Sequence, residues 1–144
     1  SLDARDMNWQ TLLAELRNQG NAMIGPHGMS FDLKSSIEET DDQPGSLLCL
    51  NLFKIYREAL TNIIKHAQAR TVNAAFSINR TRLKLVIQDD GVGVGNGRVG
   101  GRGLTNMQTR GRYLGGEILL NAECGTCVTL EIPLPLQAPL RNTR

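Results

Sequence analysis

The stretch LNLFKIYREALTNIIKHAQAR, residues 50–70, decides the fold because it predicts one long helix with a buried side. It is strongly apolar and contains neither glycine nor proline, which is typical of a helix packed against a core. The apolar positions that should face this core are Leu52, Tyr56, Ala59, Leu60, Ile63 and Ala67.

Four polar side chains interrupt this helix at Glu58, Asn62, Lys65 and His66. Their spacing places them within one arc of about 100° on a helix of 3.6 residues per turn, next to the apolar face. A carboxylate, a carboxamide, a lysine and an imidazole aligned in this way suit a bound metal and phosphate. Taken alone, the stripe is better explained by a solvated helix flank, so the rest of the chain must decide.

The composition narrows the class of protein. The 144 residues suit a single domain, and the formal net charge of +2 gives no reason to expect a nucleic acid or an anionic membrane as partner. No apolar run reaches the roughly 18 residues of a membrane span, and no signal peptide is visible, so we expect no direct membrane contact. Three cysteines give no disulfide framework and favour a reducing, cytoplasmic setting. The chain opens at Ser1 without a methionine, so we expect a piece of a longer protein, and the intact protein could be anchored in a membrane.

Periodicity along the chain predicts an α+β fold. Helices are expected over residues 7–22 (ending near Gly20), 46–70 (with Ser46 as its cap) and 104–114, and strands over residues 29–37, 71–79, 82–88, 117–122 and 127–132. This order favours a two-layer sandwich: a mixed, mostly antiparallel sheet with about three helices on one face. We expect one domain over residues 1–138, in which residues 1–45 add a helix and a strand, and a tail over residues 139–144.

A glycine-rich loop after the strand at 82–88 is the second informative region. Asp89 and Asp90 stand at the end of that strand, where a carboxylate can accept a hydrogen bond from an exocyclic amine, and Gly91 and Gly93 follow. The segment Gly101-Arg102-Gly103-Leu104 then opens a helix, whose free N–H groups point toward the loop and suit phosphate. A flexible surface loop that ends in a helix cap is the competing interpretation.

Two other motifs must be weighed. Residues 95–100, GNGRVG, match the dinucleotide fingerprint G-x-G-x-x-G, but the chain lacks a run of βαβ units, and no P-loop motif is present. Cys124 and Cys127 form a CxxC pair that could bind zinc or act in thiol redox chemistry. No second pair of ligands has a recognisable spacing, so we expect structural cysteines.

Three boxes in this order resemble the ATP-binding domain of the GHKL superfamily, which includes gyrase, histidine kinases and MutL. The segments REALTNIIKHA (57–67), DDGVGV (89–94), GRGLTNMQTRGRYLGG (101–116) and GTCVTLEIPL (125–134) are close to the sensor histidine kinases that partner LuxR/NarL-type response regulators. The boxes are separated by about 30 and about 10 residues, and their order makes the resemblance specific. It covers about residues 47–133 and implies the Bergerat fold.

The resemblance also implies roles for the site residues. Asn62 would bind Mg²⁺, Glu58 would order the water shell of the metal, and Lys65 and His66 would reach phosphate oxygens. Asp89 would accept from the amine of adenine, and the remaining residues would admit the base or present backbone N–H groups to phosphates: Gly91, Gly93, Gly101, Gly103 and Leu104.

The implied function is the ATP-binding catalytic domain of a two-component sensor histidine kinase. It would transfer the γ-phosphoryl group of Mg-ATP to a histidine on a dimerisation domain that is absent from this chain, and it would act with a LuxR/NarL-type response regulator. The alternatives are an anti-sigma-type GHKL serine kinase, a GHKL ATPase with Glu58 as general base, and a non-catalytic interaction module whose pocket has decayed.

Overall fold

The computed structural model describes residues 7–40, 43–92, 102–123 and 125–136, which form three α-helices and five strands. The elements appear in the predicted order. Their bounds are α1 Trp9–Ile24, the short 3₁₀ helix η2 Gly25–His27, β1 Ser30–Ile37, α2 Ser46–His66, β2 Thr71–Ile78, β3 Arg82–Asp89, α3 Arg102–Tyr113, β4 Glu117–Asn121 and β5 Cys127–Pro133.

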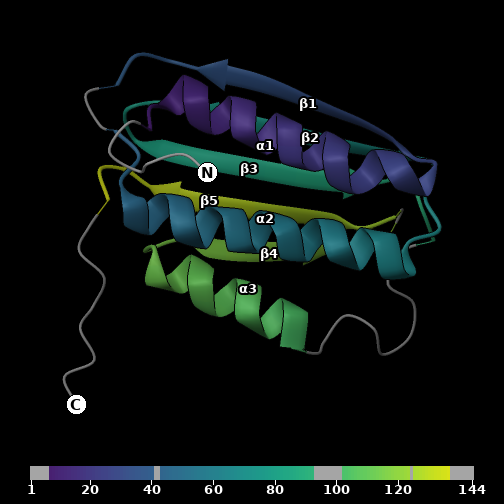
Figure 1. The fold of residues 1–144 in the computed structure, drawn as a ribbon. Helices are drawn as coiled ribbons and strands as arrows, with labels where there is room; N and C mark the ends of the chain where they lie inside the picture. Colours follow the sequence, from purple (N-terminus) through teal and green to yellow (C-terminus); the bar gives the residue numbers. More distant parts are fainter. Residues whose placement is uncertain (1–6, 41–42, 93–101, 124, 137–144) are drawn as a thin grey trace.

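The strands form a single mixed sheet in the order β1-β2-β3-β5-β4. Only the pairing of β1 with β2 is parallel, and the other three pairings are antiparallel. The three α-helices lie on the same face of this sheet (Figure 1). This arrangement confirms the predicted two-layer α+β sandwich, and it differs from a dinucleotide-binding fold, which needs a mostly parallel sheet with helices on both faces. In the part of the chain that the structure describes, no helix is long and apolar enough to cross a membrane.

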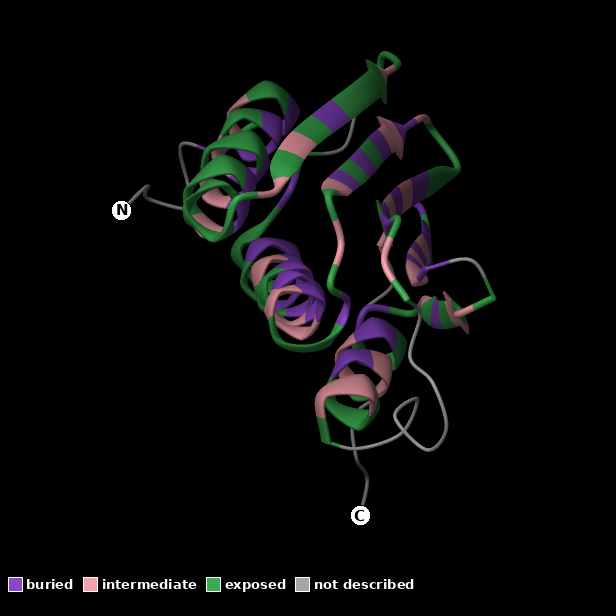
Figure 2. Cartoon of the chain, turned by 90° about the vertical axis from the view of Figure 1, so that its right-hand side faces the viewer, coloured by how far each residue is buried: buried purple, intermediate pink, exposed green. Residues whose placement is uncertain are grey.

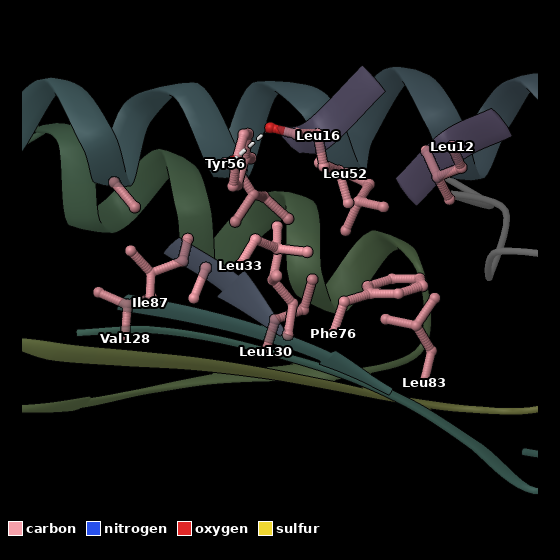
Figure 3. Close-up of a cluster of buried hydrophobic side chains, with 14 of the residues drawn as sticks. Leu12, Leu16, Leu33, Leu52, Tyr56, Phe76, Leu83, Ile87, Val128 and Leu130 are labelled. Carbon is pink, nitrogen blue, oxygen red and sulfur yellow. Dashed lines mark hydrogen bonds between the residues drawn. The ribbon is translucent and has the colours of Figure 1, made fainter. Parts of the chain in front are cut away.

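The core lies between the helices and the inner face of the sheet (Figure 2). Strands β2 and β3 alternate between buried and more exposed residues, as expected where one face of a sheet is covered. The residues predicted to face the core from α2 are all buried. Figure 3 shows Tyr56 and Leu52 of α2 above Phe76 and Leu130 of the sheet.

One buried hydrogen bond joins α1 to α2. The hydroxyl of Tyr56 donates to the carbonyl oxygen of Leu16 at 2.6 Å (Figure 3). Burial raises the pKa of this phenol, which therefore stays protonated and able to donate. The bond fixes the position of α2, which carries the polar stripe, relative to α1.

Three local predictions were wrong. The helix predicted over residues 46–70 ends at His66. The first helix does not end near Gly20 but continues to Ile24. A side chain at Gly20 would meet the ring of Phe31 and the hydroxyl of Tyr56. Glycine is used there for close packing and not for stopping the helix. Ser46 is the first residue of α2 and not its cap; Gly45 takes the cap position without a side-chain hydrogen bond.

Candidate functional site

The polar stripe of α2 lies against the first turn of α3. Glu58 and Asn62 are half-buried, whereas Lys65 and His66 are exposed in the last turn of α2. A Cβ atom added at Gly103 would lie 2.5 Å from Oε2 of Glu58 and 3.3 Å from Nδ2 of Asn62. The absence of a side chain at Gly103 therefore lets the N-terminus of α3 approach the carboxylate and the carboxamide closely.

The start of α3 has the properties expected of an anion site. Helix α3 begins at Arg102, and its first backbone N–H groups have no partner within the helix, so the positive end of the helix dipole lies beside Asn62. Leu104 is partly buried and packs against the core, so its side chain anchors the helix. Gly93 and Gly101, which were predicted to belong to the site, lie outside the described residues.

Asp89 is the most unusual polar residue of the structure. It ends β3 and is only 1% exposed. Its Oδ1 accepts hydrogen bonds from the backbone N–H groups of Gly91 at 2.8 Å and Thr126 at 3.3 Å. Its Oδ2 is buried and has no hydrogen-bond partner among the described residues. A buried acceptor without a partner is costly, so this atom suits a donor from a ligand.

Burial also changes the ionisation of Asp89. Removal from water raises the pKa of its carboxyl group, the hydrogen bonds from Gly91 and Thr126 oppose the rise, and the neighbouring charge of Asp90 adds to it. The group therefore sits in the folded protein at a free-energy cost, which is common at functional sites.

The loop after β3 is held against the end of α2. The N–H of Val92 donates to the carbonyl oxygen of Ala67 at 2.8 Å, and a Cβ atom at Gly91 would lie 2.0 Å from the same oxygen. Ala67 is the cap residue that follows α2, and Asn62 lies five residues before it. At 1.5 Å per residue, Asn62 and Ala67 are about 7.5 Å apart along the helix. Because the loop that follows Asp89 contacts Ala67, Asp89 and Asn62 belong to one site.

Sequence reasoning missed the backbone groups that build this site. The N–H of Thr126 and the carbonyl oxygen of Ala67 contribute through the main chain, which no side-chain motif reveals. Gly125 has a φ of 81° and lies against the site, because a Cβ atom there would meet the carbonyl oxygen of Asp89. Asp90 anchors the loop: its Oδ1 accepts from the N–H groups of Arg70 at 2.8 Å and Thr71 at 2.9 Å.

The other histidine of the chain and Cys127 of the CxxC pair do not contribute to this arrangement. His27 is exposed in η2. Cys127 is a free, half-buried cysteine whose sulfur lies 4.0 Å from Oγ1 of Thr129, while Cys124 lies outside the described residues. Within the described ranges, no group of three or more His, Cys, Asp or Glu side chains could hold a metal ion. A hard cation at Asn62 would therefore take its remaining oxygen ligands from water and a bound phosphate.

The raised pKa of Asp89 predicts a pH dependence of stability. The folded state holds the proton more tightly than the unfolded state, so the penalty for the buried charge is present above the raised pKa and disappears as the pH falls toward the ordinary value of 3.8. Relative to Asp89→Asn, the unmodified chain should therefore gain unfolding free energy as the pH is lowered through this window. Urea unfolding of both proteins across the acid range measures the difference, and a constant difference would contradict the prediction.

The chain is similar in sequence to a known family of proteins. The family described as histidine kinase-, DNA gyrase B- and HSP90-like ATPases matches residues 50–136, which include Glu58, Asn62, Asp89 and Gly103. The signal transduction histidine-protein kinase/phosphatase UhpB of Salmonella typhimurium is 40% identical over 85 residues, which cover 58% of this chain and 17% of that protein. The sensor histidine kinase YxjM of Bacillus subtilis is 38% identical over 85 residues, which cover 59% of this chain and 21% of that protein.

Solved structures agree on the fold. A blue-light activated histidine kinase of Erythrobacter litoralis superposes with a TM-score of 0.68 at 22% identity, over 85% of this chain and 45% of that chain. The histidine kinase AdeS of Acinetobacter baumannii gives a TM-score of 0.67 at 12% identity, over 90% of this chain and 66% of that chain. The chain thus spans only a small part of the length of the two curated relatives, 17% and 21%.

Proposed function

Because the chain belongs to the family of histidine kinase-, DNA gyrase B- and HSP90-like ATPases, we propose that it binds Mg-ATP as the catalytic domain of a sensor histidine kinase. The transfer would move the γ-phosphoryl group of ATP to a histidine on a dimerisation domain of the same intact protein. The names of the relatives UhpB and YxjM, both histidine kinases, support this choice within the family.

The Asp89 oxygen that has no hydrogen-bond partner among the described residues is the observation that carries the proposal. Adenine presents an exocyclic amine, and Oδ2 of Asp89 is a buried acceptor that needs such a donor. Oδ1 is already bonded to two backbone N–H groups, so the carboxylate is held in one orientation. A ligand amine would satisfy the remaining oxygen, and Gly91 and Gly93 would leave room for the flat base.

The other end of the site would hold the phosphates and the metal. The side-chain oxygen of Asn62 would ligate Mg²⁺, and Glu58 would orient a water molecule of the metal. The exposed Lys65 and His66 would reach phosphate oxygens from the last turn of α2. The backbone N–H groups at Gly101, Gly103 and Leu104 would meet the phosphates at the start of α3. Mg²⁺ neutralises phosphate charge during phosphoryl transfer, and positioning by these residues would supply the rest.

The partners follow from the same proposal. The intact kinase would contain the dimerisation domain with the phosphoacceptor histidine, pass the phosphoryl group to a LuxR/NarL-type response regulator, and keep this domain in the cytoplasm. The relatives that are named sensor histidine kinases support a two-component system of this kind.

Binding of Mg-ATP by the chain tests the proposal. Titration calorimetry should show a single site, and Asn62→Ala should weaken the affinity about tenfold or more in Mg²⁺ while changing it much less when Mg²⁺ is chelated, because the carboxamide acts through the metal. Asn73→Ala, at an exposed position of β2, is the matched control and should bind normally. Absence of binding to the unmodified chain would refute the proposal and support the decayed module.

The position of Glu58 beside Gly103 keeps one rival open, an ATP-hydrolysing enzyme with Glu58 as general base. Steady-state hydrolysis by the chain that disappears in Glu58→Gln would favour this rival. For a histidine kinase domain, we expect ATP binding without appreciable hydrolysis and without incorporation of labelled phosphate into the chain itself.

A further inference from the structure

A pocket of about 280 Å³ opens between α2 and α3, next to the candidate site. The two helices run antiparallel: Gly103 at the start of α3 meets Glu58, and Arg110 near its end donates a hydrogen bond to Oδ1 of Asn51 at 3.3 Å (Figure 1). The pocket is lined mostly by polar atoms, so it suits a charged or polar group and not an apolar one.

Positive charge dominates the lining. Lys54, Arg57 and Arg110 line the pocket, and Glu58 stands at one side. Arg57 donates to the neutral carboxamide of Gln19 at 3.1 Å, and the partner of Arg110 is likewise a carboxamide.

The hydrogen-bond partners of Arg57 and Arg110 are neutral, and Glu58 offsets only part of the positive charge. Across the described segments, salt bridges join Arg82 and Lys84 to Glu131 on the sheet, and none joins the three cations of the pocket to a carboxylate. An anionic group that enters the pocket would therefore meet a net positive potential.

The pocket lies near the position that we expect for the terminal phosphate of the bound nucleotide. Along α2, Asn62, Glu58 and Lys54 follow one another at intervals of four residues, or about 6 Å each. If adenine lies at Asp89 and the metal at Asn62, the terminal phosphate lies toward Glu58. The pocket then begins where the γ-phosphoryl group would leave the nucleotide.

Exposed apolar side chains lie on the same two helices, one to two turns beyond the cations. Leu47 and Leu50, in the first turns of α2, are 36% and 52% exposed, and Tyr113, at the end of α3, is 46% exposed. A partner that runs along the two helices would thus meet apolar contacts first, then the cationic pocket, and finally the reacting phosphate. Because this succession of apolar and cationic contacts extends along two helices, it suits a protein segment better than a small anion.

We infer that the pocket receives a carboxylate-bearing segment of the dimerisation domain that carries the acceptor histidine. The inference rests on the proposed function, and it assigns Lys54, Arg57 and Arg110 to recognition of the acceptor and not to binding of ATP. Charge complementarity identifies the partner chemistry, and the apolar residues at the far end add contact area.

Charge reversal in the pocket tests the inference. The double variant Lys54→Glu, Arg57→Glu changes two exposed side chains. Arg112→Glu, which changes the net charge by about half as much, is the control, because residue 112 is exposed and turned about 200° from residue 110 on α3. An oligoglutamate peptide serves as the probe. Calorimetry measures its affinity for each protein, and amide chemical shifts show which residues it contacts. The double variant should bind this peptide about tenfold more weakly, whereas Arg112→Glu should change its affinity about twofold or less.

Binding of Mg-ATP, measured on the same samples, separates the two proposals. Equal affinity of oligoglutamate for the double variant and for the control would overturn the inference, even if ATP binds normally. A tenfold loss of ATP affinity in the double variant would also overturn it, because the cations would then belong to the phosphate site. Failure of the unmodified chain to bind ATP would instead refute the proposed function.

In the intact kinase, the double variant should transfer phosphate to the acceptor histidine about tenfold more slowly, with an unchanged KM for ATP. An unchanged transfer rate would contradict a docking role for the pocket.

Discussion

Asp89→Asn should lower the affinity of the chain for ATP about 100-fold or more, without unfolding it. The two backbone N–H groups that now meet Oδ1 would keep the amide oxygen of the asparagine in place. The amide nitrogen would then occupy the position of Oδ2 and turn a donor toward the amine of adenine, so that two donors would face each other. Titration calorimetry with Mg-ATP measures the loss.

The stability of this variant should stay the same or rise at neutral pH. Burial disfavours the charged carboxylate of Asp89 and raises its pKa, and a neutral amide avoids that cost. Asp90→Asn makes the same chemical change one residue later. Asp90 accepts the N–H groups of Arg70 and Thr71 through a single oxygen, which an asparagine also provides, so ATP binding should change about threefold or less. An Asp89→Asn protein that binds ATP as well as the Asp90→Asn protein would exclude adenine from the Asp89 site.

Gly91→Ala should destabilise the chain by about 3 kcal/mol and weaken ATP binding as well. The added Cβ would lie 2.0 Å from the carbonyl oxygen of Ala67. A backbone atom cannot turn aside as the end of a side chain can, so the loop must move away from α2. This movement would disturb the N–H of Gly91 that holds Asp89 and the N–H of Val92 that holds Ala67.

Gly45→Ala is the control for this variant. Gly45 has an extended backbone with a φ of −82° and a ψ of 175°, and a Cβ atom there would meet nothing within 4 Å. Gly45 takes the cap position of α2, so its replacement should change the free energy of unfolding by about 1 kcal/mol or less. Chemical unfolding of both variants gives the comparison, and similar stabilities would show that the loop can move away from α2 at little cost.

Side-chain periodicity made most of the fold predictable. The apolar positions of α2, such as Leu52 and Leu60, follow the helical period and are buried as predicted, and the antiparallel strands show their alternation in the sequence. The prediction that Gly20 ends a helix was wrong because local propensity ignores what packs against a residue from elsewhere. Phe31 and Tyr56 approach Gly20 from distant parts of the chain, and no local signal reveals this.

In the candidate site, too, the sequence predicted what depends on local spacing and not what depends on contacts between distant residues. Glu58 and Asn62 lie one turn apart on a helix, so sequence spacing alone placed them together. Their contact with Gly103 needed the resemblance of three separated boxes to a known family. The support of Asp89 by Thr126 could not be predicted, because a backbone N–H group is present at almost every residue and only the register of β3 with β5 selects this one.

The hydrogen bond between Thr126 and Asp89 determines when the site becomes complete during synthesis of the chain. The two residues are 37 positions apart, and Thr126 immediately precedes β5, which pairs with β3 in the middle of the sheet. On the ribosome, α1, α2 and the first three strands emerge before Thr126 exists. The end of the site at Asp89 is therefore completed only after Thr126 has been made, and a nascent chain that stops before Thr126 lacks one of the two donors that orient Asp89.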